Sequence, residues 1–202
     1  MLSAASASLS PDHWFSTDEQ FNFLYPGPIR LLAAKHWTPL HITQRVVRYL
    51  TPTDNARVLD IGSGVGKFCL AAAWSMPSAF FTGVEQRKGL VSHAYTAQAI
   101  LKLKNVEFIH GNFTRLDFDQ YDHFYFYNSF YENLVDTEKI DDNIAYSPEL
   151  YDYYNRYLYK RLDERPAGTR LVTYHSLESE IPPSYHLVEA QVNDLLKFWI
   201  KS

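Results

Sequence analysis

One segment, V-L-D-I-G-S-G-V-G-K-F from Val58 to Phe68, limits most strongly what this chain can fold into. Its apolar beginning is typical of a buried strand, and closely spaced glycines follow before a second apolar run that is typical of a helix. Glycine lets the backbone turn sharply and approach a ligand closely. The first helical turn offers unpaired N–H groups and a positive dipole end to an anion. The segment therefore predicts a strand, a turn and a helix that bind a ligand at the carboxyl end of the strand.

The rest of the chain alternates between strand and helix patterns. Apolar residues that recur every four positions, such as Ile42, Val46 and Leu50, indicate a helix that we expect to start at Thr38-Pro39. The expected strands cover residues 57–61, 79–84, 106–109, 123–127, 170–174, 185–190 and 196–200. The last two are joined by a connection too short for a parallel crossover. The predicted fold is α/β: a doubly wound, mostly parallel, seven-stranded Rossmann-like sheet with an antiparallel C-terminal strand pair.

Length and composition set the broad class. A chain of 202 residues suits one domain, so we expect residues 1–12 to form a disordered tail and 13–202 a single domain with an N-terminal helical cap. The net charge of -4 does not indicate a nucleic-acid partner, and the scattered histidines predict no metal site. The absence of a long apolar run and the single Cys69 favour a cytoplasmic protein without a membrane span. The oligomeric state stays open.

Two carboxylates identify the ligand class. Asp60 ends the first strand, and Glu85 follows 25 residues later, where its carboxylate can accept both hydroxyls of a ribose. Dinucleotide-binding folds carry G-x-G-x-x-G, whereas here the third glycine comes one residue early and Lys67 takes its place. Asp60 would also repel a pyrophosphate but would favour a ligand that carries an ammonium and a sulfonium group. S-adenosylmethionine (SAM) is therefore the predicted cofactor.

With these motifs the sequence resembles the class I, Rossmann-like, SAM-dependent methyltransferases over roughly residues 36 to 202. Asp60, Gly62, Gly64 and Gly66 match the first motif of that family, and Glu85 matches its ribose-binding acid. The resemblance implies a cofactor site that also includes the neighbouring residues Ser63 and Gln86.

The same resemblance implies residues for the two ends of the cofactor. Asn112 matches the position that contacts the adenine amino group, where Asp is more usual, and Phe113 would flank the adenine. Trp37 and Thr38 precede the first helix, where the chain of family members often folds over the cofactor. Trp37 could cover the methionine end, and packing in the core is the alternative for it.

The end of the fourth strand suggests the acceptor. Asn128 to Tyr131, N-S-F-Y, occupies the place of Asn/Asp-Pro-Pro-Tyr/Phe in amino-group methyltransferases, although both prolines are absent. The segment also shows a weaker resemblance to the non-SET-domain histone lysine methyltransferases. This implies catalytic roles for Asn128 and Tyr131. The alternative is that Asn128 only ends the strand and contacts the cofactor.

An acidic stretch follows, from Glu132 to Glu149, and it holds six acids and one base. It predicts either a lid that favours a cationic acceptor or a plain surface loop. The sequence thus predicts a SAM-dependent methyltransferase whose acceptor is an amino group of a protein or small molecule. A small-molecule O-methyltransferase, a non-catalytic SAM-binding protein and an NAD(P)-dependent oxidoreductase are the alternatives, in that order.

Overall fold

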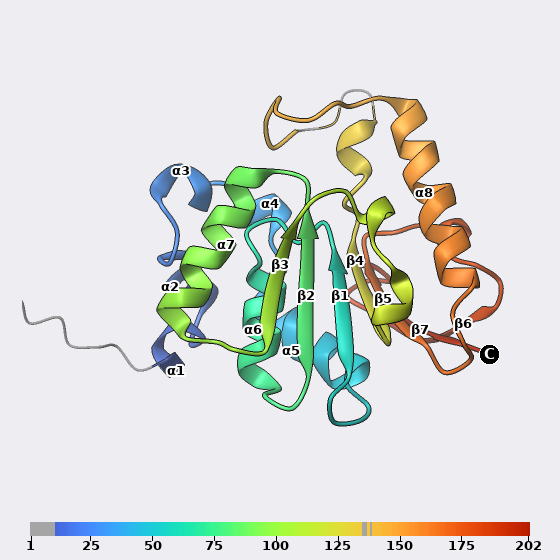
Figure 1. Cartoon of the computed structure of the whole chain (residues 1–202), viewed down its shortest axis with the longest axis horizontal. Coiled ribbons are helices and arrows are strands. Elements are labelled where there is room, and N and C mark those ends of the chain that lie inside the picture. Colours follow the sequence, from blue (N-terminus) through green and yellow to red (C-terminus); the bar gives the residue numbers. More distant parts are fainter. Residues whose placement is uncertain (1–10, 135–136, 138) are drawn as a thin grey trace, which may run out of the picture.

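The computed structural model describes residues 11–134, 137 and 139–202 (Figure 1). The tail expected over residues 1–12 lies outside the described residues, except that α1 begins at Pro11. The strands are β1 (Arg57–Ile61), β2 (Phe80–Glu85), β3 (Val106–His110), β4 (His123–Tyr127), β5 (Arg170–Tyr174), β6 (Tyr185–Gln191) and β7 (Leu196–Lys201). Each begins and ends within one residue of the expected position.

The strands form one seven-stranded sheet in the order β3-β2-β1-β4-β5-β7-β6. All neighbours from β3 to β5 are parallel, whereas β7 runs antiparallel to both β5 and β6. This confirms the predicted fold class. The chain order reverses between β1 and β4, and in open α/β sheets ligands bind at such a switch point, beyond the carboxyl ends of the strands.

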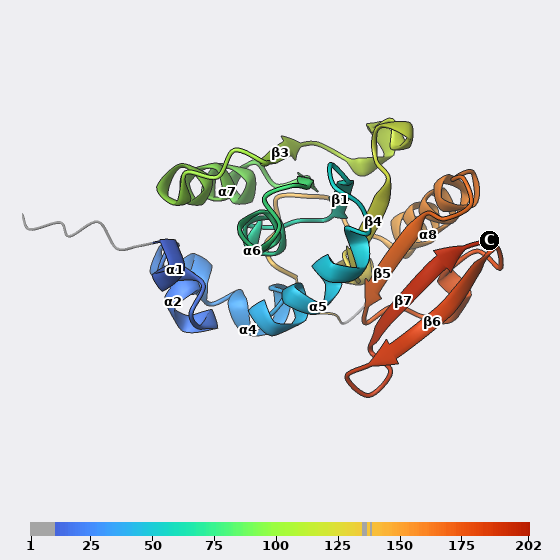
Figure 2. The ribbon, with the colours of Figure 1, turned by 90° about the horizontal axis from the view of Figure 1, so that it is seen from below.

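Helices cover both faces of the sheet (Figure 2). The longer helices are α5 (Leu40–Leu50), α6 (Lys67–Ser75), α7 (Lys88–Leu101) and α8 (Pro148–Asp163). Apolar side chains of α5, α6 and α7 share one core with alternate strand residues such as Val58 and Phe81. Those of α8 share the second core with the residues between them, such as Leu59 and Val84, and with the short 3-10 helices η1 (Phe113–Arg115) and η2 (Phe118–Gln120).

Helix α5 begins at Leu40, one residue later than expected for a helix capped by Thr38. Thr38 does not cap it, because the Thr38 side chain is buried and shares a hydrogen bond of 2.9 Å with the Tyr125 hydroxyl on β4. Asp18 takes that role instead, since its Oδ1 accepts the N–H of Leu40 at 3.0 Å. A residue that is remote in sequence therefore satisfies a free N–H group of the first helical turn.

Four short helices precede α5, namely α1 (Pro11–Trp14), α2 (Asp18–Asn22), α3 (Gly27–Arg30) and α4 (Ala33–His36). Lys67, which replaces the third glycine of the dinucleotide pattern, connects one of them, α2, to the glycine turn. Its Nζ lies 2.6 Å from Asp18 Oδ1 and 3.1 Å from Asn22 Oδ1, and its side chain is 4% exposed. Burial lowers the pKa of Lys67, while Asp18 opposes that shift.

Asp18→Asn should therefore destabilise the fold, because it removes the countercharge of a buried ammonium while keeping an oxygen that can accept from Leu40. Asp18 is partly exposed, so solvent screening limits the expected loss in the free energy of unfolding to about 1–2 kcal/mol. Urea unfolding measures it, with Glu19→Gln as the control at an exposed neighbouring acid. Equal midpoints for the two variants would contradict the role of the ion pair.

Candidate active site

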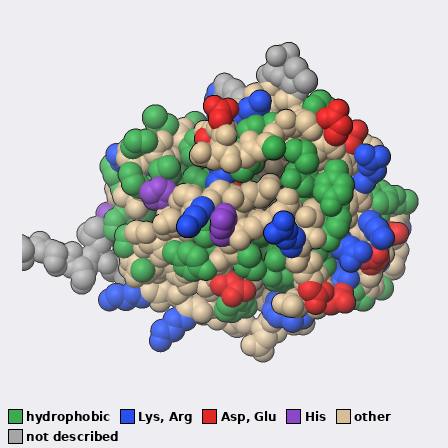
Figure 3. Space-filling model, turned by 45° about the horizontal axis from the view of Figure 1, so that its top comes forward, with side chains coloured by type: hydrophobic (Ala, Val, Ile, Leu, Met, Phe, Trp, Pro, Cys, Tyr) green, Lys and Arg blue, Asp and Glu red, His purple; other side chains and the backbone are tan. Residues whose placement is uncertain are grey.

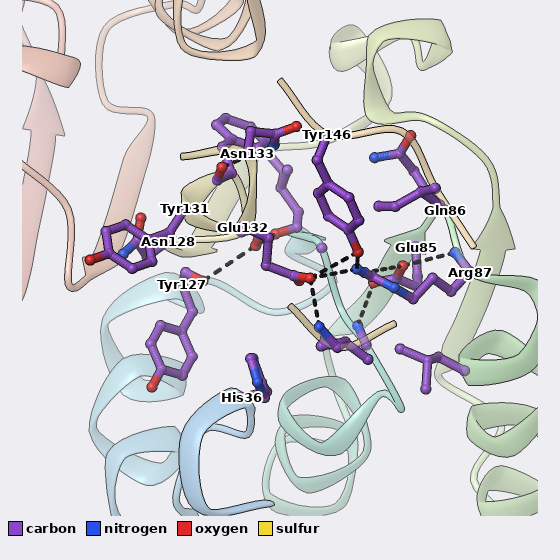
Figure 4. Close-up of a pocket in the computed structure, with 18 of the residues that line it drawn as sticks. His36, Glu85, Gln86, Arg87, Tyr127, Asn128, Tyr131, Glu132, Asn133 and Tyr146 are labelled. Carbon is purple, nitrogen blue, oxygen red and sulfur yellow. Dashed lines mark hydrogen bonds and ion pairs between the residues drawn. The ribbon is translucent and has the colours of Figure 1, made fainter. Parts of the chain in front are cut away.

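A cavity of about 410 Å³ opens at the carboxyl ends of β1, β2 and β4 (Figure 4). This volume falls within the range of about 300–1,000 Å³ that is usual for small-molecule sites. The glycine turn forms its floor, the end of α4 and Trp37 form one side, and residues after β2 form the other. The acidic segment after β4 closes it from above, which Figure 1 shows as the chain that crosses over the strand ends before α8.

The glycine turn depends on left-handed backbone at Gly62 and Gly66, whose φ angles are +79° and +81°. Residues with a Cβ adopt this region at a cost. Added Cβ atoms would also collide with the Ser129 side chain at Gly62 and with the Phe108 ring at Gly66. Both glycines are therefore required for the turn, and Gly62 itself lines the cavity.

Glu85 lies at the end of β2 with its carboxylate fixed on both oxygens. Oε2 accepts the N–H of Gly64 at 3.1 Å, and Oε1 accepts the N–H of Arg87 at 2.8 Å. Burial raises the pKa of Glu85, and the N–H and guanidinium groups of Arg87 oppose that shift. The carboxylate thus presents remaining lone pairs to the cavity from a fixed position, as an acid that holds two ribose hydroxyls requires.

The end of the cavity next to Glu85 can hold an adenine. Gln86 and Phe113 line it, and Phe113 stacks on Phe130 with ring centroids 5.0 Å apart. Asn112 is not part of the lining: its Nδ2 donates to Gln86 Oε1 and to the Tyr154 hydroxyl, and its Oδ1 accepts from Thr114. Asn112 therefore lies behind the cavity wall, where its hydrogen bond orients the side chain of Gln86.

Trp37 lines the opposite end, where a methionine moiety would lie. It is nevertheless buried, its ring meets the Tyr25 ring edge to face at 4.9 Å, and the Lys67 ammonium lies 5.7 Å from its centroid. The two interpretations of Trp37 from the sequence are thus compatible. Thr38, bonded to Tyr125, does not line the cavity.

Asp60 lies beneath the glycine turn and outside the cavity lining. The Cys69 thiol donates to its Oδ2 at 3.4 Å, and the side chain is 4% exposed. Burial raises the pKa of Asp60 from 3.8 to about 7. Ser63, next to it in the turn, has a buried hydroxyl with no hydrogen-bond partner among the described residues.

The residues that end and follow β4 form the cavity wall next to the glycine turn, where an acceptor can lie. Asn128 lines the cavity with a left-handed φ of +40°, a conformation that Asn adopts more readily than most residues with a Cβ. The Ser129 hydroxyl donates to the carbonyl of Ile61 at 2.6 Å and so fixes the segment against β1. Phe130 is buried and Tyr131 is exposed at the mouth of the cavity.

The acidic stretch proves to be part of the site and not a detached surface loop. Residues Thr137, Ile140, Ile144, Ala145 and Tyr146 line the cavity. Glu132 and Asp141 are both paired with Arg87, at 2.6 and 3.1 Å. Two of the acids that were expected to attract a cationic acceptor are therefore held by one guanidinium, whose single positive charge they share with Glu85.

The structure brings most of the expected residues together. Eight of them line the cavity: Trp37, Gly62, Gly64, Glu85, Gln86, Phe113, Asn128 and Tyr131. Five do not line it: Thr38 and Asn112 lie behind the wall, Asp60 lies below the turn, and Ser63 and Gly66 belong to the turn itself. Arg87 and Tyr146 were missed, although a base two residues after the ribose acid and a stretch with an excess of acids together could have suggested an ion pair.

Two kinds of feature are absent from residues 11–134, 137 and 139–202. No helix there is long and apolar enough to cross a membrane. No group of three or more His, Cys, Asp or Glu side chains there is placed to hold a metal ion.

Comparisons with known proteins agree with this geometry. A family model described as "Methyltransferase domain" matches residues 52–197. The release factor glutamine methyltransferase of Buchnera aphidicola is 31% identical over 110 residues, which are 53% of this chain and 38% of that protein. The RNA methyltransferase of Salinibacter ruber, solved with S-adenosylhomocysteine, shares the fold with a TM-score of 0.55 and 21% identity over 82% of this chain and 93% of that one. TrmN from Thermus thermophilus shares the fold with a TM-score of 0.56 and 15% identity over 85% of this chain and 51% of that one.

The chain thus belongs to the methyltransferase domain family, in its class I SAM-dependent branch. Its domain is that of a SAM-dependent methyltransferase, with SAM as its cofactor, so the oxidoreductase alternative falls away. The cavity fits this group: a fixed carboxylate lies at its edge, an aromatic ring lies at one end and a glycine turn lies below. The chain spans 38% of the length of the Buchnera relative.

Proposed function

We propose that this enzyme methylates a nitrogen atom, and that a side-chain amide of a protein is the acceptor it fits best. The observation that carries the proposal is the position of Asn128, which lies on the cavity wall beside Gly62 with an exposed aromatic ring, Tyr131, next to it at the mouth (Figure 4). An amide oxygen can accept a hydrogen bond from an N–H group at any physiological pH.

SAM, when bound, supplies a methyl group on a positively charged sulfur. The chain then has to hold the acceptor nitrogen close to the methyl group and in line with the bond that breaks. Asn128 suits this task because its backbone is fixed by Ser129, whose hydroxyl bonds Ile61 on the neighbouring strand. Tyr131 offers a face against which a flat acceptor group can pack.

The carboxylates that line the cavity are engaged by hydrogen bonds and are not free general bases. Glu85 and Glu132 both line the cavity, and both are paired with Arg87. Neither carboxylate is therefore free to act as the base that a charged amine needs before its nitrogen can be methylated. The name of the Buchnera relative, a release factor glutamine methyltransferase, also supports an amide nitrogen.

A nucleic-acid acceptor receives less support. The neighbour named as an RNA methyltransferase shares the fold at 21% identity, and the chain carries a net charge of -4. Figure 3, which tips the strand ends toward the viewer, shows acidic and basic side chains mixed on that face with apolar ones between them. A basic surface of the kind that neutralises phosphates is not what this face presents.

The test compares acceptors and one variant. Methyl transfer from labelled SAM should reach glutamine-containing peptides, and the product should be an N-methyl amide that resists mild base. Asn128→Ala should lower kcat about 100-fold, as expected when one oriented contact to the reacting group is lost. Its dissociation constant for S-adenosylhomocysteine should stay within about threefold of the unmodified enzyme.

Asn193→Ala is the matched control, because Asn193 is an exposed Asn with a left-handed φ of +52° in the turn between β6 and β7. It should leave kcat unchanged. A base-labile methyl ester, a methylated phenol or methylated RNA as the preferred product would overturn the proposal, and so would full turnover by Asn128→Ala.

A further inference from the structure

The side chain of Arg87 joins the cofactor half of the site to the acceptor half. It is 6% exposed and lies at the N-terminus of α7, two residues after Glu85. Its Nε donates to Asp141 Oδ1 at 3.1 Å, and its Nη2 donates to Glu132 Oε2 and to the Tyr146 hydroxyl, each at 2.6 Å. Its Nη1 lies 3.5 Å from Glu85 Oε1.

Glu132 is the acceptor of several hydrogen bonds in this network. It directly follows Tyr131, in the short helix η3 (Tyr131–Asn133). Its Oε2 accepts not only from Arg87 but also from the N–H of Ile140 at 3.0 Å and from the Tyr146 hydroxyl at 3.2 Å. These contacts fasten the residues that form the upper wall of the cavity, as the dashed lines in Figure 4 show.

The charges explain why this network holds together. Burial opposes the charge of Arg87, but the carboxylates of Glu132 and Glu85 outweigh that effect and raise its pKa. The guanidinium fork contacts three carboxylates that come from separate parts of the chain. A lysine, with one point charge, cannot make these contacts in the same directions.

We propose that Arg87 is a positioning residue that couples cofactor binding to the placement of the acceptor wall. The backbone N–H and Nη1 of Arg87 hold Glu85 in place for the ribose. Its Nε and Nη2 hold Glu132, Asp141 and Tyr146 over the cavity. Whatever fixes Glu85 should then also fix the 139–146 segment, and by thermodynamic linkage the segment should strengthen cofactor binding by the same factor. The proposal depends on SAM binding alone and not on the nature of the acceptor.

Two variants test the coupling without an acceptor. Glu132→Gln and Asp141→Asn remove charges that have no hydrogen bond or ion pair with Glu85 in the described structure, yet each should weaken S-adenosylhomocysteine binding about five- to tenfold, the lower range of typical coupling. Asp142→Asn is the matched control: it removes an exposed acid of the same segment that makes no ion pair among the described residues, and it should leave the dissociation constant unchanged.

The second readout is cleavage by trypsin after Lys139. This residue is exposed, and the N–H of the bond to be cut belongs to Ile140 and is held by Glu132. Saturating S-adenosylhomocysteine should slow this cleavage about tenfold in the unmodified enzyme. In Arg87→Met, cleavage should be fast and should no longer respond to the ligand, and Arg87→Lys should restore only part of the response.

A purely structural role for Arg87 makes a different prediction, namely equal ligand affinity in Glu132→Gln and Asp142→Asn. That result, or cleavage of the unmodified enzyme at the same rate with and without S-adenosylhomocysteine, would overturn the proposal. The cleavage experiment on the unmodified enzyme needs no variant to fold. Failure of the amide-acceptor proposal would leave both readouts untouched.

Discussion

Glu85→Ala should weaken S-adenosylhomocysteine binding by at least about 150-fold. The Glu85 carboxylate has both oxygens fixed, by Gly64 and by Arg87, at the edge of the cavity. Two hydroxyl groups that donate to a charged acceptor contribute about 1.5–3 kcal/mol each. Their joint loss is at least about 3 kcal/mol, and about 1.4 kcal/mol corresponds to a tenfold change in the dissociation constant.

Titration calorimetry on the folded variant measures this change. Glu85→Gln is a useful companion, because it keeps the shape and one acceptor oxygen, and it should fall between the alanine variant and the unmodified enzyme. Glu107→Ala is the control at a carboxylate on the neighbouring strand β3 whose contact is with Thr82. An affinity in Glu85→Ala equal to that of the control would remove Glu85 from the cofactor site.

Affinity should also depend on pH in a defined direction. Burial raises the pKa of Glu85 above that of a free carboxyl. The carboxylate accepts hydrogen bonds from both hydroxyls, whereas its protonated form has lost acceptor capacity. Binding should therefore weaken as the pH falls through this raised pKa, and the weakening should disappear in Glu85→Gln. Calorimetric titrations at several acidic pH values measure the effect.

Local sequence signals were sufficient for the fold and for bringing the glycine turn and Glu85 together in the candidate site. The alternation of strands and helices follows from apolar periodicity, and each strand fell within one residue of its expected position. Gly62 and Glu85 could be found because the turn needs left-handed backbone and because β2 must end beside β1 in a parallel sheet. These constraints act over a few residues or through the regular geometry of β-α-β units.

Contacts between remote segments could not be predicted in the same way. Arg87 meets Glu132, Asp141 and Tyr146 at sequence separations of 45, 54 and 59 residues, and Asp141 and Tyr146 lie outside the helices and strands. Asp18 replaces Thr38 at the start of α5 for the same reason, since the choice of partner depends on how the N-terminal helices pack. Periodicity carries no information on such pairs.

Asp60 shows the difference between identifying a residue and placing it. The motif identified it correctly as the acid at the end of β1, and alternation along the strand put its side chain on the face covered by α6. There it meets the thiol of Cys69, a weak donor. A carboxylate buried in this way destabilises the folded protein when it is ionised.

The free energy of unfolding of Asp60→Asn, relative to that of the unmodified protein, should therefore increase as the pH rises. The pKa of Asp60 is about 7 in the folded protein, compared with 3.8 for an Asp side chain that is not buried. The folded state thus binds the proton more tightly than the unfolded state, so the stability contributed by this group is full below about pH 4 and is lost as the pH rises to about 7. Between pH 5.5 and 8 the difference between variant and unmodified protein should grow by about 2 kcal/mol.

Urea unfolding at several pH values measures this difference, and the difference matters more than either curve alone. Burial lowers the pKa of His123 to about 4, so the stability linked to that group is lost as the pH falls below 6.5, the opposite trend. His123 is present in both proteins and cancels in the comparison. Asp54→Asn, at an exposed acid before β1, is the control for removing a negative charge. If the curve for Asp60→Asn ran parallel to that of the unmodified protein from pH 5.5 to 8, Asp60 would not be the buried titrating acid that the structure indicates.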